Sequence, residues 1–311
     1  MRSWTKEAMN KETHMPDAAL DEQLAALKLK AIDDFSKSCL EGAQRALWDR
    51  ENPLRLNLFS TAMRILFEHM MDTMAPIDEV VRSPWFKPEK DDGKPTRGQR
   101  IVYAIQGGLS EDFVRDKLKV DPAPLRKRLL AAVDECSKQV HAREYTVIAD
   151  LDRQDVIAAA TIAAVSDLLD AVHFCRRAIL EPIVETLDDA AVEALMNETI
   201  LEVDELATHH YIQEVYVADT TVHSIGSQTI SYRSTGSINV ILQFGSNSDV
   251  ERGDGAELEE SFPFSCDIEV PLVDPWDLGL AETRYGVDVS SWRDAMKPDD
   301  VDLMPNDDED Y

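Results

Sequence analysis

The chain has 311 residues, of which 44% are hydrophobic, and a formal net charge of −28. This length suits two domains, or one domain with an appended module, and the hydrophobic content is that of an ordinary globular protein, which argues against a disordered chain. Its four cysteines are far apart and form no C-x-x-C pair, which argues against a zinc ribbon and a disulfide framework and indicates a reducing compartment. No apolar run approaches about 20 residues and the N-terminus lacks a signal-peptide core, so we expect a cytoplasmic protein that does not enter a membrane.

The negative charge is concentrated in the last third of the chain. From Asp188 onward there are 29 Asp and Glu against 5 Lys and Arg, a net of −24, which leaves −4 for the first 187 residues. Arg82 to Arg128 is locally basic, with 12 Lys and Arg against 7 Asp and Glu. A polyanion is repelled by the acidic third, so we expect any nucleic acid to bind the first part of the chain.

The first 210 residues have helical patterning. We predict a flexible leader over residues 1–15 and a helical domain over residues 16–210, whose first helix begins near Pro16 and runs through the thirties. A second helix follows Asn52-Pro53, with Phe59, Met63, Leu66, Met70 and Met74 at three- and four-residue steps, and Pro76 ends it.

Residues 76–96 are predicted to form a loop, and Thr96 is a suitable N-cap for a helix over Arg97–Gln106 that Gly107-Gly108 would end. Further helices are expected to follow up to residue 210, and the long one that begins near Asp152 is rich in alanine.

Two-residue periodicity replaces the helical pattern in the last third. Residues 238–244 and 262–270 alternate apolar and polar side chains, as half-buried strands do. We therefore predict an antiparallel sheet or sandwich over residues 211–275 and a peripheral acidic tail over residues 276–311. The fold class is α+β, with a helical domain followed by a small β module.

Arg64 and His69 on the second predicted helix form an R-x4-H pattern. This pattern resembles that of HEPN ribonucleases, which are helical and usually dimeric. An imidazole can move protons at the 2′-hydroxyl while a guanidinium neutralises phosphorane charge. A five-residue step turns about 140° around the helix axis, so a dimer groove would have to bring the two side chains together. The alternative is that Arg64 pairs with Glu68 and His69 has no catalytic role.

A metal-dependent alternative rests on Asp78 with Asp92-Gly93-Lys94, which has the D-x13-D-x-K spacing of restriction-type nucleases. In those enzymes the carboxylates bind Mg²⁺ and the lysine assists the attacking water. The second acid lies there on a strand, whereas residues 91–95 here are composed like a turn. No cofactor is therefore favoured, and Mg²⁺ belongs to this alternative only.

A basic segment interleaved with Trp85, Phe86 and Tyr103 suits phosphate binding and base stacking. The alternative is a solvated charged face with the rings as core anchors. The candidate nucleic-acid-binding residues are Lys87, Lys90, Lys94, Arg97, Arg100 and Arg115.

Three stretches together resemble the bacterial proteins described as predicted pPIWI-associating nucleases. They are residues 75–80 (APIDEV) with 84–86 (PWF), residues 93–100 (GKPTRGQR), and residues 242–249 (LQFGSNSD) with 261–264 (SFPF). The resemblance extends from about residue 55 to 295. It implies phage or plasmid defence with nucleic acid as the target, and it assigns no catalytic residues.

The favoured hypothesis is a defence protein that targets nucleic acid, as a metal-independent ribonuclease acting through Arg64 and His69, in a homodimer or with a defence partner protein. One alternative is a non-catalytic sensor or adaptor whose acidic β module binds a basic protein. The other is the Mg²⁺-dependent nuclease. Whether the protein is an enzyme is left open by the sequence.

Overall fold

The computed structural model describes residues 18–141, 143–144, 147–197 and 199–295. The chain divides into two compact units. The helical unit comprises the chain up to Glu181 together with Ile225–Thr229, and the sheet unit comprises the remainder. The predicted α+β class is confirmed. The predicted leader over residues 1–15, the helix start at Pro16 and the end of the predicted tail after residue 295 lie outside the described residues.

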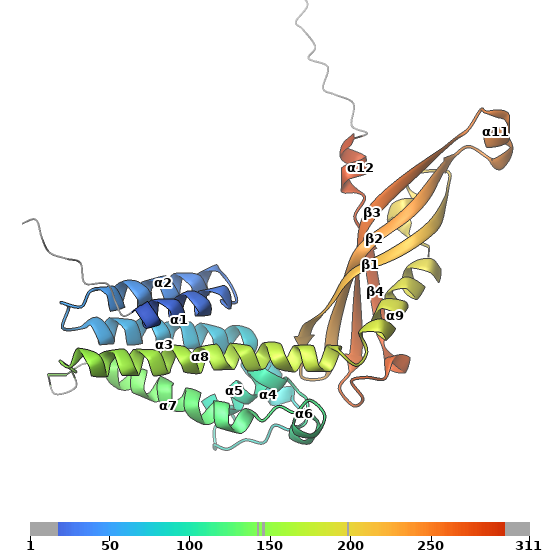
Figure 1. The fold of residues 1–311 in the computed structure, drawn as a ribbon. Helices are drawn as coiled ribbons and strands as arrows, with labels where there is room; N and C mark the ends of the chain where they lie inside the picture. Colours follow the sequence, from blue (N-terminus) through green and yellow to red (C-terminus); the bar gives the residue numbers. More distant parts are fainter. Residues whose placement is uncertain (1–17, 142, 145–146, 198, 296–311) are drawn as a thin grey trace, which may run out of the picture. The chain divides into compact units, whose positions relative to one another are not determined.

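The helical unit is a bundle in which α3 and α8 lie between the α1–α2 pair and α7 (Figure 1). Its helices are α1 (Ala18–Leu29), α2 (Asp34–Trp48), α3 (Arg55–Met74), α4 (Ile77–Arg82), α5 (Arg97–Gln106), α6 (Glu111–Asp116), α7 (Pro122–Val140) and α8 (Leu151–Leu180).

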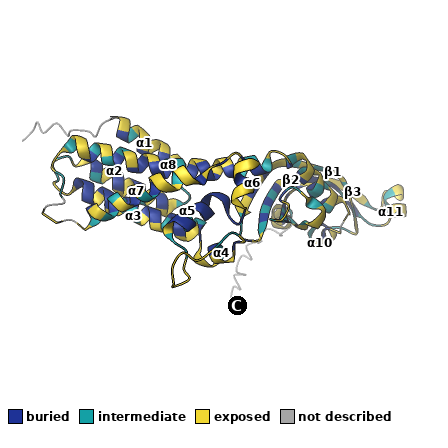
Figure 2. Ribbon diagram, turned by 90° about the horizontal axis from the view of Figure 1, so that it is seen from below, coloured by how far each residue is buried: buried dark blue, intermediate teal, exposed yellow. Residues whose placement is uncertain are grey.

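The core of the bundle follows the three- and four-residue apolar spacing of the sequence. On α3, Phe59, Met63, Leu66 and Met70 are each no more than 2% exposed. Exposed residues lie on the outer faces of the helices and buried ones on their inner faces (Figure 2). The expected helix before Pro76 is therefore present, and it ends at Met74.

The long first helix of the prediction is two helices. α1 ends at Leu29 and α2 begins at Asp34, because the Asp33 side chain accepts a hydrogen bond from the Ser36 backbone N–H at 2.7 Å and caps α2. The apolar stripe continues across the break, which is why the periodicity alone predicted one helix.

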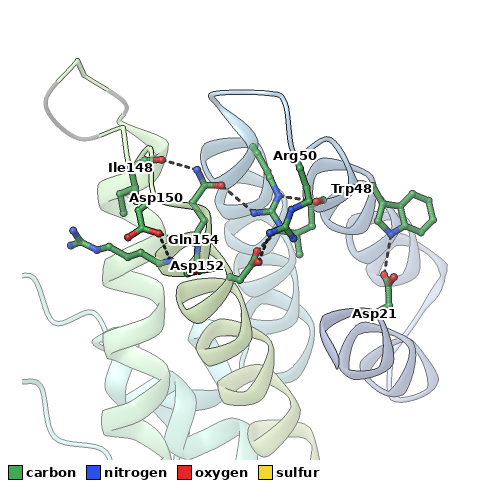
Figure 3. A network of polar contacts seen from close by, with 11 residues as sticks. Asp21, Trp48, Arg50, Ile148, Asp150, Asp152 and Gln154 are labelled. Carbon is green, nitrogen blue, oxygen red and sulfur yellow. Dashed lines mark hydrogen bonds and ion pairs between the residues drawn. The ribbon is translucent and has the colours of Figure 1, made fainter. Parts of the chain in front are cut away.

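A buried arginine joins α2, α3 and α8. The Arg55 side chain is fully buried, and it donates to the Leu47 carbonyl at 2.7 Å, to Gln154 Oε1 at 3.2 Å and to Asp155 Oδ1 at 2.6 Å. Arg50 pairs with the other oxygen of Asp155 at 3.1 Å, and Gln154 also donates to the Ile148 carbonyl (Figure 3). The network satisfies a charge that burial would otherwise make costly.

Among the described residues, one helix is long and apolar enough to cross a membrane, namely α8. Half of its apolar window is buried in the bundle, as happens in core helices of soluble proteins, so the composition of α8 is weak evidence for a membrane span. We expected from the sequence that no segment would be apolar enough to cross a membrane. This expectation was wrong, because 18 consecutive residues of α8 are apolar enough and include at most two charged side chains.

The sheet unit contains one four-stranded antiparallel sheet in the order β1-β2-β3-β4, and α9 and α10 pack against it. Its elements are α9 (Val184–Asn197), α10 (Leu201–Asp204), β1 (His209–Ile225), β2 (Thr229–Phe244), α11 (Asn247–Arg252), β3 (Ala256–Pro271), the 3-10 turn η1 (Leu278–Leu280), β4 (Glu282–Val287) and α12 (Ser290–Ala295).

Two features of this unit differ from the sequence-based boundaries. α9 packs against β3 and β4, and α10 packs against β4, so both helices belong with the sheet and not with the helical domain ending at residue 210. Part of the predicted peripheral tail forms β4, which pairs with β3 in a register that places Asp267 opposite Arg284. β4 is mostly exposed and has no apolar alternation, so its sequence carried no strand signal.

The turn between β1 and β2, residues 225–229, is grouped with the helical unit. The Gly108 N–H donates to the Gly226 carbonyl at 2.9 Å, and the Ser227 N–H donates to Glu79 Oε2 at 3.1 Å. Gly107 has a φ of +59°, and a Cβ there would lie 2.3 Å from the Ile225 carbonyl oxygen. Only glycine fits this position, which ends α5 as predicted.

Candidate nucleic-acid interface

The start of α5 is fixed by a capping box. Thr96 Oγ1 accepts from the Gln99 N–H at 3.3 Å, and Gln99 Oε1 accepts from the Thr96 N–H at 2.9 Å. Gln99 Nε2 also donates to the Lys87 carbonyl at 2.7 Å, which fastens the preceding loop to the helix. The predicted helix over Arg97–Gln106 with its cap at Thr96 is confirmed, because the T-x-x-Q signature determines it locally.

A groove of about 880 Å³ lies between this helix start and the first half of α7. Four cations line it, Lys90 and Arg97 on one side and Arg126 and Lys127 on α7, together with a single acid, Glu89. We call this the basic groove; its lining residues are Glu89, Lys90, Thr96, Arg97, Gly98, Ala123, Arg126, Lys127 and Leu130. Its formal side-chain charge is 4 − 1 = +3, in a chain whose total is −28.

Gly98 allows the two walls of the basic groove to approach each other. A Cβ at this buried position would lie 3.3 Å from Arg126 Cδ and 3.7 Å from Leu130 Cδ1. The aliphatic part of Arg126 therefore passes close to α5 at Gly98, while the residue as a whole is exposed and lines the groove.

The cations of the basic groove are largely unneutralised. Arg97 has one distant partner, Asp134, at 4.0 Å. Within the described ranges, Lys90, Arg126 and Lys127 form no ion pair, and all three are exposed. Exposed cations without carboxylate partners are available to phosphate oxygens.

The other predicted cations lie elsewhere. Arg100 donates to Asp72 at 2.7 Å and to the Ala75 carbonyl at 3.0 Å, so it holds α5 against the end of α3. Arg115 pairs with Asp112 and Asp116, and these bonds raise its pKa. Lys87 and Lys94 are exposed on the loop before α5 and do not line the groove. The structure thus gathers Lys90 and Arg97 from the predicted set and adds Arg126 and Lys127.

The aromatic residues of this region do not line the groove. Trp85 Nε1 donates to the Gly107 carbonyl at 2.9 Å. Tyr103 is 4% exposed and donates to Glu79 Oε2 at 3.2 Å, and burial raises the pKa of its phenol. Both side chains are anchors for the fold, and no ring lies among the lining residues. The arrangement offers phosphate contacts without a stacking platform.

Arg64 and His69 have separate partners. Arg64 Nε pairs with Glu68 Oε1 at 2.9 Å, the partner expected at the four-residue step. His69 Nε2 lies 2.6 Å from Asp33 Oδ2, and its ring meets the edge of Phe35 with centroids 4.8 Å apart. Both side chains are partly exposed, but within one copy of the chain they are not brought to a common point. A carboxylate that holds an imidazole in this way can orient it for proton transfer.

Asp33 therefore has two roles, as the cap of α2 and as the partner of His69. The Ser36 backbone N–H, and after it His69, lower the pKa of this carboxyl to about 2 from an ordinary value of 3.8. Nothing in the sequence singled out this residue, because its partner is 36 positions away.

The stability of α2 should depend on the Asp33 charge. A carboxyl whose pKa is lower in the folded state stabilises the fold above its unfolded pKa, and this contribution is lost as the pH falls from about 4 towards 2. Asp33→Asn keeps a capping oxygen but does not titrate, so part of the loss of stability in this window should disappear. Urea midpoints between pH 5 and pH 2 measure this; identical pH profiles for the two proteins would contradict it.

The residues of the metal-dependent alternative, Asp78, Asp92 and Lys94, do not lie on a strand. Asp78 is on α4, whereas Asp92 is in a turn in which its Oδ1 accepts from the Lys94 N–H at 3.0 Å and Gly93 has a φ of +68°. The described residues contain no group of three or more His, Cys, Asp or Glu side chains arranged to bind a metal ion. The expected Asp-x-Lys therefore has the structure of an Asx turn.

The fold and the basic groove define a two-part α+β protein with a cationic surface on its helical unit. Two models of the family described as predicted pPIWI-associating nuclease match this chain, one over residues 27–165 and the other over residues 172–293. Together they span most of the sequence, and the chain belongs to this family. The family description supports a nuclease-like role. No curated protein and no solved structure matches the chain significantly.

Proposed function

We propose that this protein targets nucleic acid in defence against phages or plasmids, and that its helical unit binds the sugar-phosphate backbone along the basic groove. The observation that carries the proposal is the convergence of Lys90, Arg97, Arg126 and Lys127 around one groove with a single acid. Cations that lie close together and are not paired repel one another, and a bound polyanion would remove this local repulsion.

Binding should depend on phosphates and not on base identity. The groove is lined by two guanidinium and two ammonium groups, one carboxylate, one hydroxyl and aliphatic side chains, without a ring on which an unpaired base could stack. Contacts of this kind position a nucleic acid but carry no sequence information. We therefore expect similar affinities for unrelated sequences and a strong dependence on salt.

For catalysis we propose a metal-independent reaction on RNA, with His69 as the base and Arg64 as the phosphate clamp. His69, held by Asp33, takes the proton of a 2′-hydroxyl, whose oxygen forms a bond to phosphorus while the bond from phosphorus to the 5′-oxygen breaks. The products are a 2′,3′-cyclic phosphate and, once the leaving oxygen receives a proton, a 5′-hydroxyl. Arg64 would leave Glu68, an exposed pair of small stability, to neutralise the phosphorane charge. Bringing the two residues together requires a second copy of the chain.

Cleavage assays with the purified protein test this mechanism. We expect cleavage of labelled RNA and not of DNA in EDTA, and His69→Ala should slow it by about 10²–10⁴-fold, the usual contribution of a general acid or base. Arg64→Ala should also slow cleavage. His173→Ala is the matched control, because His173 is an exposed histidine on α8 of the same unit, and it should cleave like the wild type.

The outcomes separate the three hypotheses. If His69→Ala cleaves as fast as the wild type, the metal-independent mechanism is wrong. Activity that needs Mg²⁺ and is lost in Asp92→Asn favours the restriction-type alternative. If RNA and DNA bind but are not cleaved in any ion condition, the protein is a sensor or adaptor, for which the specific observation is the acidic sheet unit, with its net charge of −24 from Asp188 onward.

A further inference from the structure

β1 is a long strand at the edge of the sheet, and it lacks the lysine, the proline and the short length that commonly protect an edge. The strand order gives β1 a neighbour, β2, on one side only, and β1 is 17 residues long. Its sequence, HHYIQEVYVADTTVHSI, contains no Lys, Arg, Pro or Gly. Proteins commonly block edge strands with lysine, proline or a short length, because the unpaired N–H and C=O groups can pair with another chain.

The opposite side of the sheet is formed by a much shorter strand. β4 has only 6 residues and contains Arg284 and Gly286. It pairs with residues 264–269, one half of β3. β1 therefore presents one continuous edge of 17 residues, whereas the opposite side of the sheet is shared by β4 and by residues 256–263 of β3, which β4 does not cover.

The side chains of β1 provide an apolar surface beside this edge. Tyr211 and Tyr216 are 49% and 62% exposed, which is unusual for rings on a strand. Ile212, Val215 and Val217 are half-buried on the same segment. Exposed rings next to unpaired backbone groups are suited to strand addition, in which main-chain bonds supply affinity and alternate side chains supply specificity.

Charge determines which kind of strand fits. Within β1 the formal charges are Glu214 and Asp219, and the chain from Asp188 onward has a net charge of −24. A basic segment would be attracted by this field. A second copy of β1 would be repelled in the antiparallel register centred between Tyr216 and Val217, because that register sets Glu214 opposite Asp219 of the other copy.

We propose that the free edge of β1 binds an extended segment of a partner protein, rich in Lys and Arg, as an added antiparallel or parallel strand. The sheet unit supplies this surface, so the proposal does not depend on whether the helical unit cleaves nucleic acid. It gives the acidic third of the chain a role as a protein-binding module.

Fluorescence polarisation with the full chain tests the proposal. The probe is a labelled peptide of about ten residues, a common strand length, in which lysine alternates with valine and threonine. A second peptide has the same sequence with every second backbone amide methylated, which removes strand donors but keeps the charge. Tyr216→Lys places a blocking cation on the edge, and Leu258→Lys, at an exposed position of β3, is the control with the same added charge.

We expect the unmodified peptide to bind and the methylated peptide to bind at least about tenfold more weakly, since strand addition depends on backbone hydrogen bonds. Tyr216→Lys should weaken binding by a similar factor. Leu258→Lys should weaken it by less than about threefold, because β2 separates β3 from β1 and the added charge then acts only through screened electrostatics. Amides of residues 211–219 should become protected from hydrogen exchange.

Three results would overturn the proposal. One is that the peptide does not bind the wild-type chain. Another is equal binding of the methylated and unmodified peptides, which would mean that charge alone attracts them. The third is a dimer in sedimentation that Tyr216→Lys dissociates, which would show that a second copy occupies β1. The comparison of the two peptides uses the wild-type protein, so it remains decisive even if a variant fails to fold.

Discussion

Reversing the charge of Arg126 and Lys127 should reduce the affinity for nucleic acid by at least about 100-fold at 0.1 M salt. Each phosphate contact is worth about tenfold under those conditions, because it releases condensed counterions. The two residues supply half of the four cations of the basic groove and form no ion pair among the described residues. Fluorescence anisotropy with a labelled duplex, for Arg126→Glu/Lys127→Glu against the wild type, measures the effect.

The fold should tolerate this change. Both side chains are exposed, and neither forms an ion pair among the described residues, so reversing their charge breaks no salt bridge of the fold. The matched control is Lys37→Glu/Arg45→Glu, which makes the same change in net charge on exposed positions of α2. If the two double variants lose equal affinity, the overall charge governs binding and the basic groove is not the site.

Arg55→Met should destabilise the helical unit by about 3–5 kcal/mol, the usual cost of removing one partner from a buried ion pair. Methionine keeps the volume of the side chain but leaves the Leu47 carbonyl and Gln154 Oε1 without the donors that Arg55 supplies. Asp155, whose side chain is 16% exposed, would keep only Arg50. Denaturant unfolding followed by far-ultraviolet circular dichroism measures the loss.

The control for this prediction is Arg45→Met on α2. Its side chain is 77% exposed and its guanidinium lies 4.0 Å from the Glu41 carboxylate, so the substitution should cost less than about 1 kcal/mol. Arg55→Lys should recover only part of the stability that Arg55→Met loses, because an ammonium group lacks the planar guanidinium that reaches three acceptors in different directions. Equal stability of the Arg55 and Arg45 variants would show that the network shown in Figure 3 contributes no net stability.

The parts of the fold that could be predicted are those determined by neighbours in the sequence. The capping box at Thr96 and the glycine that ends α5 specified that helix to the residue. The alternation of apolar and polar residues correctly predicted a strand over residues 238–244, which lie in β2, and another over residues 262–270, which lie in β3. The apolar stripe of α3 and the proline after it gave the helix its end.

The parts that could not be predicted depend on partners distant in the sequence. Arg55 can be buried because its acceptors Gln154 and Asp155 lie on α8, about 100 positions away in the sequence. From the sequence alone, an arginine at the start of a helix is expected to be exposed. β4 exists because it pairs with β3, and its own residues do not alternate. Arg126 and Lys127 lay in a visible run of three cations, but only the packing of α7 on α5 places them beside Arg97.

The Arg64 and His69 pattern shows the same limit. The four-residue step to Glu68 was sufficient to predict the ion pair of Arg64. The hydrogen bond from His69 to Asp33 connects α3 with the cap of α2, and no spacing rule reveals it. The pattern therefore located a histidine with a carboxylate partner, while the role of Arg64 beside it stays a proposal.

Photo-crosslinking tests the central claim most directly, namely that phosphates contact the helical unit through the basic groove. A duplex of about 20 base pairs, long enough to cover several phosphate contacts, would carry a crosslinker on its backbone, and the attached peptides would be identified by mass spectrometry. Crosslinks concentrated in residues 87–130 and lost in Arg126→Glu/Lys127→Glu are the predicted result. Crosslinks concentrated beyond Asp188, or spread evenly along the chain, would contradict it.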